Sequence, residues 1–570
     1  MCGIVAIQDP GLTSEDARAA VEQSLGSLRH RGPDDGGCVV TAGAGLGMRR
    51  LTMRSASVDS VPFAVGDGSH AALNGEVYAV TPAGTGAAPQ PSRTVLGGAD
   101  EVECVFEEGT ASCEGMWGAI RLSPDGTMVA TRDPFGIKPL WVRTTETGVG
   151  LASELPALEV AGPLPSIRRR AVAEFLLLGR FVDGQTIRNG IRALPPGTRT
   201  SWKAGEPIET RMWERPREGL ADGGLSAARP TSAEIVEAID ESVRWCVDSE
   251  RPLGVALSGG LDSTILAHHL LRQGVVELAS VSVRVEGVDD GVRDLAELPV
   301  QGAMGGWRHR ARTVDIGEFL PLLRRCVRIF GEPTSLTSTP LYLALSELAA
   351  DAGIVALLVG EGADELWGGY SSYLDIARDA DVVAHYAPAP IRDWVTDLLG
   401  SAELVDEVCT TCRDWLPGPR GSELVRQAER QMSLEPLLYR TDMLTMSQSI
   451  EARVPFLHGR AAELPDAFTL AELAGDGQTK RPLRTAYDEA FAGRTPPKTP
   501  FRAPWSRWLD EGLMDDVMQI LESNLSALDE LGVRPSVVRE VAVAATAADP
   551  SARMLLFRLT TLCLWIEECG

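Results

Sequence analysis

The 570-residue sequence has too few basic residues to balance its acidic ones. It contains 54 Lys and Arg against 79 Asp and Glu, a net charge of -25. Nucleic-acid binding needs a basic footprint, so this composition argues against a nucleic-acid partner. The sequence also lacks an uninterrupted apolar run of about 18 residues, which a membrane helix would need. We therefore expect a protein that acts on neither nucleic acid nor membrane.

Several other sequence signals are missing. The N-terminus, MCGIVAIQDP, has no basic segment of a secretory signal. The ten cysteines are scattered along the chain instead of forming a dense framework, which predicts reduced thiols and a cytoplasmic location. Cys409 and Cys412 form a lone CxxC without a second ligand pair, which favours packing over metal binding and leaves their role open. There is no repeat with a period of 20–50 residues and no GxxxxGK phosphate loop.

The pattern of apolar and turn residues changes along the sequence and divides the chain in two. Residues 1–213 are rich in short apolar runs broken by turn residues, such as Ile4–Ile7 and Leu140–Val142, which is typical of a sheet-dominated domain. Residues 214–230 are polar and rich in Gly and Pro and read as a linker. Thr231 and Glu234 then form a capping box, which predicts a helix start. The expected second domain spans residues 231–570.

The second half alternates strand and helix patterns. The apolar run Leu253–Leu257 is followed by a glycine turn, a helix that ends near Gly274, and a strand over Leu278–Val285. This order predicts a parallel, doubly wound α/β sheet. The chain from about Pro388 onward is largely helical in pattern, so the predicted class is α/β multidomain with helical additions.

Cys2 is a candidate nucleophile. If the initiator Met is removed, its α-amine is free, and such amines have a pKa of about 7.7–8, close to working pH. The amine could then act as the general base of its own thiol, as in the pairing of a threonine with its N-terminal amine. A cysteine at position 2 is weak evidence alone, but it stands with RHRGPDDGG (29–37), the Arg50–Leu51 pair, NGEVY (74–78), Asp100 and RDPFGIKPLW (132–141).

With these motifs, the first half resembles the glutaminase domain of class II amidotransferases, N-terminal nucleophile hydrolases built as an αββα sandwich. The resemblance implies that Cys2 is the nucleophile and that Asn74 and Gly75 form the oxyanion hole. Such donors are worth about 10²–10³ in rate each. It implies that RHRGPD orders the site and that RDPFGIKPLW is scaffold. The implied glutamine-binding residues are Arg50, Asn74, Glu76 and Asp100.

The second half carries a glycine-rich turn, LSGGLDS (257–263), that follows a strand and opens a helix, a geometry suited to binding phosphate. A second piece, VGEGADELWGGY (359–370), follows another apolar run. Together they resemble the ATP pyrophosphatase domain of glutamine-hydrolysing asparagine synthetases, which adenylate a carboxylate with ATP. The resemblance implies that Asp262 and Asp364 share Mg²⁺, which prefers carboxylates and phosphate oxygens. The other implied residues are Leu257, Ser258, Gly259, Gly260, Ser263 and Val283 for ATP, Gly360 and the essential Glu361 in the second loop, and Lys498 as the charge-neutralising lysine.

The stretch DMLTMSQSIEARVPFLH (442–458) matches a further motif of this family, and either packing or direct contact with the site remains open. Four departures fall on the acceptor side. Val359 stands where the family has a serine, and Leu336 stands where aspartate-specific members have an arginine. His458 stands in place of the final Asp of the family motif VPFLD, and Pro500 stands in place of a glycine. Loss of an arginine fork and a hydroxyl should weaken binding of a small dicarboxylic amino acid.

We therefore predict that this enzyme uses glutamine-derived ammonia to amidate a larger, less polar carboxylate than aspartate, as in natural-product biosynthesis. Ammonia would travel through an internal tunnel, which keeps water from the adenylate. Amidation of aspartate remains the main alternative. A glutamine analogue as nitrogen donor, a ring-closing synthetase with an inactive N-terminal domain, and a non-enzymatic relative are the others. Family members are often dimers, so a homodimer is possible.

Overall fold

The computed structural model describes residues 2–41, 43–53, 60–80, 90–91, 99–106, 113–159, 162, 165–212, 229–275, 277–287, 306–374, 382–416, 426, 428–496 and 501–570. Most of the predicted linker 214–230 lies outside these residues, and so do Lys498 and Pro500. Within the described residues, no helix is both long and apolar enough to cross a membrane.

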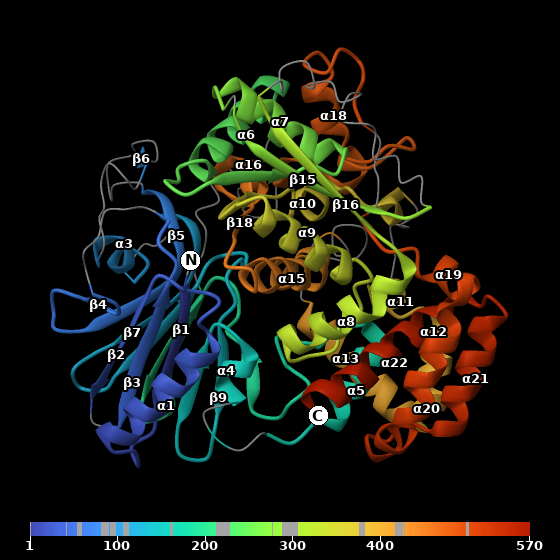
Figure 1. Ribbon diagram of the computed structural model, residues 1–570, viewed down its shortest axis with the longest axis horizontal. Helices are drawn as coiled ribbons and strands as arrows, with labels where there is room; N and C mark the ends of the chain where they lie inside the picture. The colour runs from blue at the N-terminus through green and yellow to red at the C-terminus, as the bar shows by residue number, and fades with distance from the viewer. Residues whose placement is uncertain are drawn as a thin grey trace.

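The first half contains two stacked antiparallel sheets (Figure 1). All seven residues of the central strand β1 are buried, because helix α1 packs on one face of its sheet and β5 of the second sheet faces the other. This layering confirms the prediction of a sheet-dominated first domain. The first sheet runs β11 (Ile191–Ala193), β9 (Trp141–Thr144), β10 (Val149–Ala152), β1 (Cys2–Gln8), β3 (Ala44–Arg50) and β2 (Asp35–Thr41); the second runs β13 (Glu206–Met212), β12 (Thr198–Lys203), β8 (Met128–Arg132), β7 (Cys113–Leu122), β5 (His70–Val80) and β4 (Phe63–Ala64), with β6 (Gln90–Pro91) beside β5.

The second half is built on a five-stranded sheet whose neighbouring strands are all parallel. The predicted doubly wound sheet is therefore confirmed. Its first helix, α6, begins where the sequence predicts, because Thr231 Oγ1 accepts from the Glu234 N–H and Glu234 Oε2 accepts from the Thr231 N–H at 3.3 and 2.8 Å. The strand order is β16 (Arg308–Val314), β15 (Ala279–Val285), β14 (Leu253–Ala256), β17 (Ala356–Leu358) and β18 (Glu451–Arg453).

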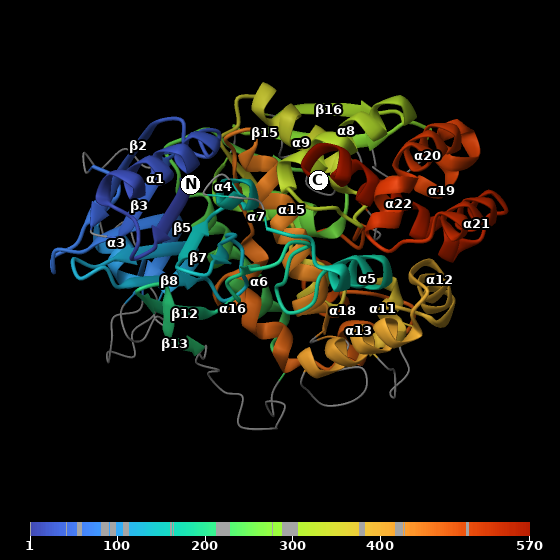
Figure 2. The ribbon, with the colours of Figure 1, turned by 90° about the horizontal axis from the view of Figure 1, so that it is seen from below.

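The helices complete both halves, and a separate group of them closes the side of the molecule opposite the stacked sheets, as both views show (Figures 1 and 2). The helix bounds are α1 (Ser14–Ser27), α3 (Ala99–Cys104), α4 (Leu155–Glu159), α5 (Arg169–Leu178), α6 (Ser232–Cys246), α7 (Leu261–Arg272), α8 (Ile316–Phe330), α9 (Thr339–Asp351), α10 (Ala363–Trp367), α11 (Val382–Tyr386), α12 (Ala389–Leu399), α13 (Ala402–Trp415), α15 (Glu435–Met446), α16 (Gly459–Glu463), α17 (Leu470–Leu473), α18 (Arg481–Tyr487), α19 (Trp505–Trp508), α20 (Met514–Glu530), α21 (Pro535–Thr546) and α22 (Pro550–Cys569).

Helix α5 lies within the predicted first domain but packs against α12, α13 and α22 of the second half. Arg558 of α22 donates to the Leu176 and Leu177 carbonyls near the end of α5, at 2.7 and 3.0 Å. One continuous hydrophobic core contains both α5 and the C-terminal helices. Cys409 and Cys412 of α13 are buried in this same core. The two halves are thus joined by a shared core as well as by the chain.

Candidate functional site

The candidate nucleophile lies at the start of a buried strand. Cys2 begins β1 and stands opposite Arg50 of β3 in the antiparallel register. Its backbone N–H donates to Asn74 Oδ1 at 3.2 Å, which fixes the predicted oxyanion side chain beside the thiol. Gly75 follows in β5 with a φ of 147°, and a Cβ there would lie 1.9 Å from the Met116 carbonyl oxygen. The fold therefore requires glycine at this position and brings Cys2, Asn74 and Gly75 together.

The environment of the Cys2 thiol favours its protonated form. Burial raises the pKa of the thiol, and a backbone hydrogen bond from Leu51 and the charge of Arg50 offset this only in part. The thiolate is the reactive form of cysteine, so the site needs a base to generate it. This fits the prediction that the α-amine of Cys2 acts as that base.

The predicted glutamine-binding residues differ in the groups that they contact. Asp100 lies in the first turn of α3, which is held to β5 by Glu101 Oε1 accepting from the Val77 N–H at 2.9 Å. Arg50 lies over the Phe63 ring at 5.7 Å. Glu76, in contrast, accepts from Arg453 of the second half at 2.6 Å and is buried. Its predicted contact with the ammonium group of glutamine stays a prediction.

The glycine-rich turn of the second half has the geometry of a phosphate loop. It joins β14 to α7, whose N-cap is Gly260, so the first N–H groups of α7 point out of the loop. Ser263 Oγ donates to the Gly260 carbonyl at 3.1 Å and accepts from the Ser258 N–H at 3.2 Å, which closes the turn on itself. The Leu257 N–H donates to the Val281 carbonyl at 2.9 Å, which ties the loop to β15, the strand of Val283.

The two predicted metal-binding carboxylates meet, and a lysine that the sequence analysis did not select lies between them. Lys480 Nζ is 2.6 Å from Asp262 Oδ1 and 2.6 Å from Asp364 Oδ1. Gly360 packs so closely on the first loop that a Cβ there would lie 3.0 Å from Asp262 Cβ. Burial lowers the pKa of Lys480, but the two carboxylates outweigh burial and raise it. Lys480 is therefore the cation that the structure places between these two carboxylates, whereas the predicted Lys498 lies outside the described residues.

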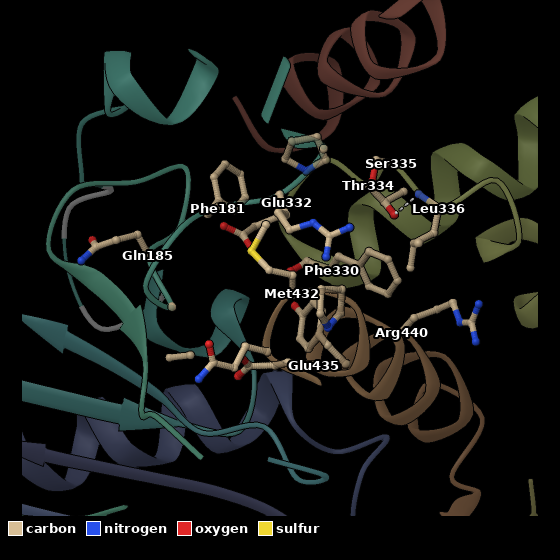
Figure 3. Close-up of a pocket in the computed structure, with 18 of the residues that line it drawn as sticks. Phe181, Gln185, Phe330, Glu332, Thr334, Ser335, Leu336, Met432, Glu435 and Arg440 are labelled. Carbon is tan, nitrogen blue, oxygen red and sulfur yellow. Dashed lines mark hydrogen bonds between the residues drawn. The ribbon is translucent and has the colours of Figure 1, made fainter. Parts of the chain in front are cut away.

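The acceptor side is organised by Arg440 of α15, a second residue that the sequence analysis missed. Its guanidinium donates to Glu361 Oε1 at 2.6 Å and to Ser338 Oγ at 2.5 Å, and lies 4.5 Å from the centre of the Tyr342 ring. Arg440 and Leu336 also line the same pocket, on the side opposite Gln185 (Figure 3). Of the predicted acceptor positions, Leu336 lies in this group. Val359 does not line the pocket; it is buried, and its N–H donates to the Arg453 carbonyl at 3.0 Å.

His458 lies elsewhere. Its ring packs edge-on against Tyr78 of β5 with a centroid distance of 4.9 Å, and the side chain is fully buried. It is not among the residues that line the pocket of Leu336. Its identity therefore bears on the contact between the halves more directly than on the acceptor.

The motifs that the sequence assigned to ordering and scaffold also make contacts between the halves, and Arg31 donates to the Cys2 carbonyl at 3.2 Å. Arg31 of RHRGPD donates to Asp442 at 2.5 Å, and Lys138 of RDPFGIKPLW donates to the same carboxylate at 3.2 Å. Arg453 donates to both Glu76 and Glu451, at 2.6 and 2.5 Å. All six side chains are buried. The stretch 442–458 therefore contacts the glutaminase half, a contact that the sequence did not predict, and direct contact with the synthetase site stays a prediction.

A thiol beside an oxyanion cradle, joined to a phosphate loop with paired carboxylates, defines a two-site enzyme of the glutamine-dependent ligase class. Residues 234–567 match the family model described as asparagine synthase, and residues 1–213 match the glutamine amidotransferase domain. The chain belongs to the asparagine synthase family and is a glutamine-hydrolysing carbon–nitrogen ligase. This family is ATP-dependent.

Several known proteins are similar to this chain in sequence or structure. The chain is 25% identical to a Mycobacterium tuberculosis protein described as a glutamine-hydrolyzing asparagine synthetase, over 90% of this chain and 89% of the relative. It is 23% identical to glutamine-hydrolyzing asparagine synthetase 1 of Bacillus subtilis, over 92% and 90%. It is 27% identical to amidase chry2 of Gibberella zeae, over 69% and 62%. The solved glutamine phosphoribosylpyrophosphate amidotransferase of B. subtilis aligns over 55% of this chain and 81% of its own, with 14% identity and a TM-score of 0.27.

Proposed function

We propose that this ligase adenylates and amidates a carboxylate that is larger and less polar than aspartate. The observation that carries the proposal is the position of Leu336. Where aspartate-specific relatives are expected to carry an arginine, Leu336 lines a mainly apolar pocket, next to the Arg440 that binds Glu361. An aliphatic side chain there cannot make the bidentate contact that an arginine guanidinium makes with a second carboxylate. It favours an acceptor whose remaining part is apolar.

In the glutaminase half, Cys2 attacks the amide carbon of glutamine after its proton passes to the α-amine. The Asn74 side chain and the Gly75 N–H stabilise the oxygen that becomes negative, the role for which such donors are preorganised. Arg50 and Asp100 orient the glutamine. The protonated α-amine returns this proton to the leaving nitrogen, so that ammonia departs as a thioester forms at Cys2. Water then hydrolyses the thioester, which releases glutamate and restores the thiol.

In the synthetase half, the N–H groups of the loop 258–263 hold the phosphates, and Leu257 and Val283 border the adenine. Mg²⁺ fits this site, because the carboxylates of Asp262 and Asp364 are hard oxygen ligands of the kind that it prefers and would hold it beside the phosphates. In the described part of the chain, no group of three or more His, Cys, Asp or Glu residues could hold a metal by itself. When bound, the ion would neutralise phosphate charge, and Lys480 would balance the charge of the departing pyrophosphate.

Glu361 and Arg440 act on the acceptor side. Arg440 holds Glu361 in place, so Glu361 can accept a proton from the ammonia that attacks the acyl-adenylate. Ammonia travels between the halves, where the buried side chains of Arg453, Glu76 and Glu451 exclude bulk water. Cytoplasmic location, a homodimer and glutamine itself as the only nitrogen donor stay predictions.

The test is pyrophosphate release from ATP with glutamine and a panel of carboxylates. We expect aromatic and long acyl acids to support release at rates well above aspartate. Turnover of aspartate at a rate equal to the best acceptor would support ordinary asparagine synthesis instead. Pyrophosphate release without any Cys2-dependent glutamate release would favour a ring-closing synthetase, and Cys2→Ala is the control that separates the two reactions.

A further inference from the structure

Helix α15 contacts residues of both halves within three consecutive positions. Arg440 and Thr441 donate to the same oxygen of Glu361, at 2.6 and 3.4 Å. Asp442 accepts from Arg31 of the glutaminase half at 2.5 Å. Residues 440 and 442 are about 200° apart around a helix with 3.6 residues per turn, so their side chains leave α15 on opposite sides. One turn of this helix therefore holds Glu361 on one side and contacts the glutaminase half on the other.

Arg31 connects Asp442 to the candidate nucleophile. Its side chain is fully buried, and its Nε donates to the Cys2 carbonyl at 3.2 Å. The Cys2 N–H donates to Asn74 Oδ1 at 3.2 Å, so hydrogen bonds hold the backbone on both sides of the Cys2 side chain. The other two nitrogens of the rigid guanidinium donate to Asp442 at 2.5 Å and to Glu154 at 2.9 Å. A carboxylate of the synthetase half therefore helps to fix the orientation of Arg31 and, through it, the Cys2 carbonyl.

The buried charges of this cluster are balanced only across the two halves. Arg31 and Lys138 of the glutaminase half are fully buried, and Lys138 donates to Asp442 Oδ1 at 3.2 Å. In the part of the chain that the structure describes, the carboxylates paired with these two cations are Glu154 and Asp442. Burial lowers the pKa of Arg31, but the charges of Asp442 and Glu154 outweigh burial and raise it. Without Asp442, two buried cations would share one carboxylate, which disfavours the present geometry of both.

We propose that Asp442 is a positioning residue of the glutaminase reaction. Through Arg31 it fixes the Cys2 carbonyl, and so the direction in which the Cys2 thiol faces the oxyanion donors Asn74 and Gly75. A misplacement of about 1 Å can cost about a hundredfold in rate, so a small rotation of this peptide changes turnover more than binding. The glutaminase reaction then depends on a residue of the synthetase half, although every predicted glutamine-binding residue lies in the first half. This inference rests on the proposed role of Cys2 as the nucleophile.

Asp442→Asn in the full-length protein tests the inference, because asparagine has the size of aspartate and lacks the charge that holds Arg31. We expect kcat for glutamate release from glutamine to fall at least about tenfold. KM for glutamine should change less than about twofold, since the predicted glutamine-binding residues are untouched. Binding of Mg²⁺ and ATP, measured by calorimetry on the same preparation, reports that the variant is folded. An unchanged kcat, or a loss that appears only in KM, overturns the inference.

Glu435→Gln is the matched control. Glu435 also lies on α15 and accepts from Arg132 of the glutaminase half at 2.7 Å. Arg132 otherwise donates to backbone carbonyls of residues 136, 138 and 194, whereas Arg31 donates to Cys2. This variant should keep kcat within about twofold. If ion pairs of α15 serve only to join the two halves, both variants lose kcat alike, and that outcome overturns the inference.

A double-mutant cycle tests whether Asp442 acts through Arg31. Arg31→Lys keeps a positive charge beside Asp442, but an ammonium group cannot reproduce the fixed fork of a guanidinium. It should therefore lose at least about tenfold in kcat with KM preserved. Adding Asp442→Asn to Arg31→Lys should lower kcat no further, because residues that act as a unit are not additive. Losses that multiply overturn the inference.

Two further outcomes separate this inference from the proposed function. If Asp442→Asn fails to fold, an unchanged kcat in Arg31→Lys overturns the inference by itself. Glutamate release that survives Cys2→Ala overturns the proposed role of Cys2 as well. Release that Cys2→Ala abolishes and Asp442→Asn leaves unchanged overturns only the role of Asp442.

Discussion

Replacing Arg453 with methionine removes the cation at the centre of the contact between the two halves. The guanidinium is fully buried and donates to Glu76 of the glutaminase half, to Glu451, and to the Cys246 and Asp248 carbonyls at 2.8 and 3.0 Å. Methionine has similar bulk and no charge. The variant therefore keeps the packing but leaves two buried carboxylates without their cation.

The magnitude follows from two independent routes. Breaking a buried ion pair by removing one partner costs about 3–5 kcal/mol, because the remaining charge stays buried. Burial raises the pKa of Glu451, but nearby positive charges, Arg453 first and Lys138 to a smaller extent, outweigh burial and lower the pKa to about 2 from a reference value of 4.5. A difference of that size corresponds to about 3 kcal/mol of stability at neutral pH. Both routes predict a loss of about 3–4 kcal/mol.

The sign of the pH dependence also changes. In the unaltered protein the pKa of Glu451 is depressed, so its contribution to stability is complete above about pH 4.5 and is lost as pH falls toward 2. Without Arg453 burial dominates and raises this pKa above the unfolded value. The variant should then lose stability as pH rises from about 5 to 7, whereas the unaltered protein should not.

The measurement is urea unfolding at pH 5, 6 and 7, read as the difference in midpoint between the two proteins. Arg244→Met is the control, because Arg244 pairs with Asp240 but is mostly exposed, and such surface pairs are worth about 0–1 kcal/mol. A loss for Arg453→Met below about 1 kcal/mol, or one that is the same at all three pH values, would refute the reasoning.

Three further predictions follow from the same structure. Cys2→Ala should abolish glutamate release from glutamine while ammonium salts still support pyrophosphate release, because the synthetase site is untouched; loss of both activities would contradict two separate sites. Lys480→Met should lower acceptor-dependent pyrophosphate release by at least about a hundredfold, since the departing pyrophosphate then lacks the lysine charge that balances it, and glutaminase activity measured alongside should stay near normal. Leu336→Arg should raise kcat/KM for aspartate by about tenfold or more through a restored fork and lower it for aromatic acids; unchanged ratios in a competition assay would show that position 336 does not select the acceptor.

Much of the fold and of the reagent sites is readable in the sequence because each depends on residues close together in the chain. The capping box at Thr231 predicts the start of α6, and the order of strand, glycine turn, helix and strand predicts the parallel sheet. Cys2 and Asn74 could be paired only through the resemblance to a known family. Their meeting depends on the register of two sheets, which no local pattern contains.

The sequence by itself determined that this chain has a half with a candidate thiol nucleophile and a half with a candidate nucleotide site. Each half is marked by short motifs of neighbouring residues, in which glycines, serines and carboxylates stand at spacings that suit these sites. Only the tertiary structure decided what lies between them. Lys480 reaches Asp262 across 218 positions, Arg453 reaches Glu76 across 377, and the pocket that Leu336 lines is assembled from both halves. Such contacts arise from the packing of distant segments and from the need to neutralise buried charge, so they leave no periodicity or spacing in the chain.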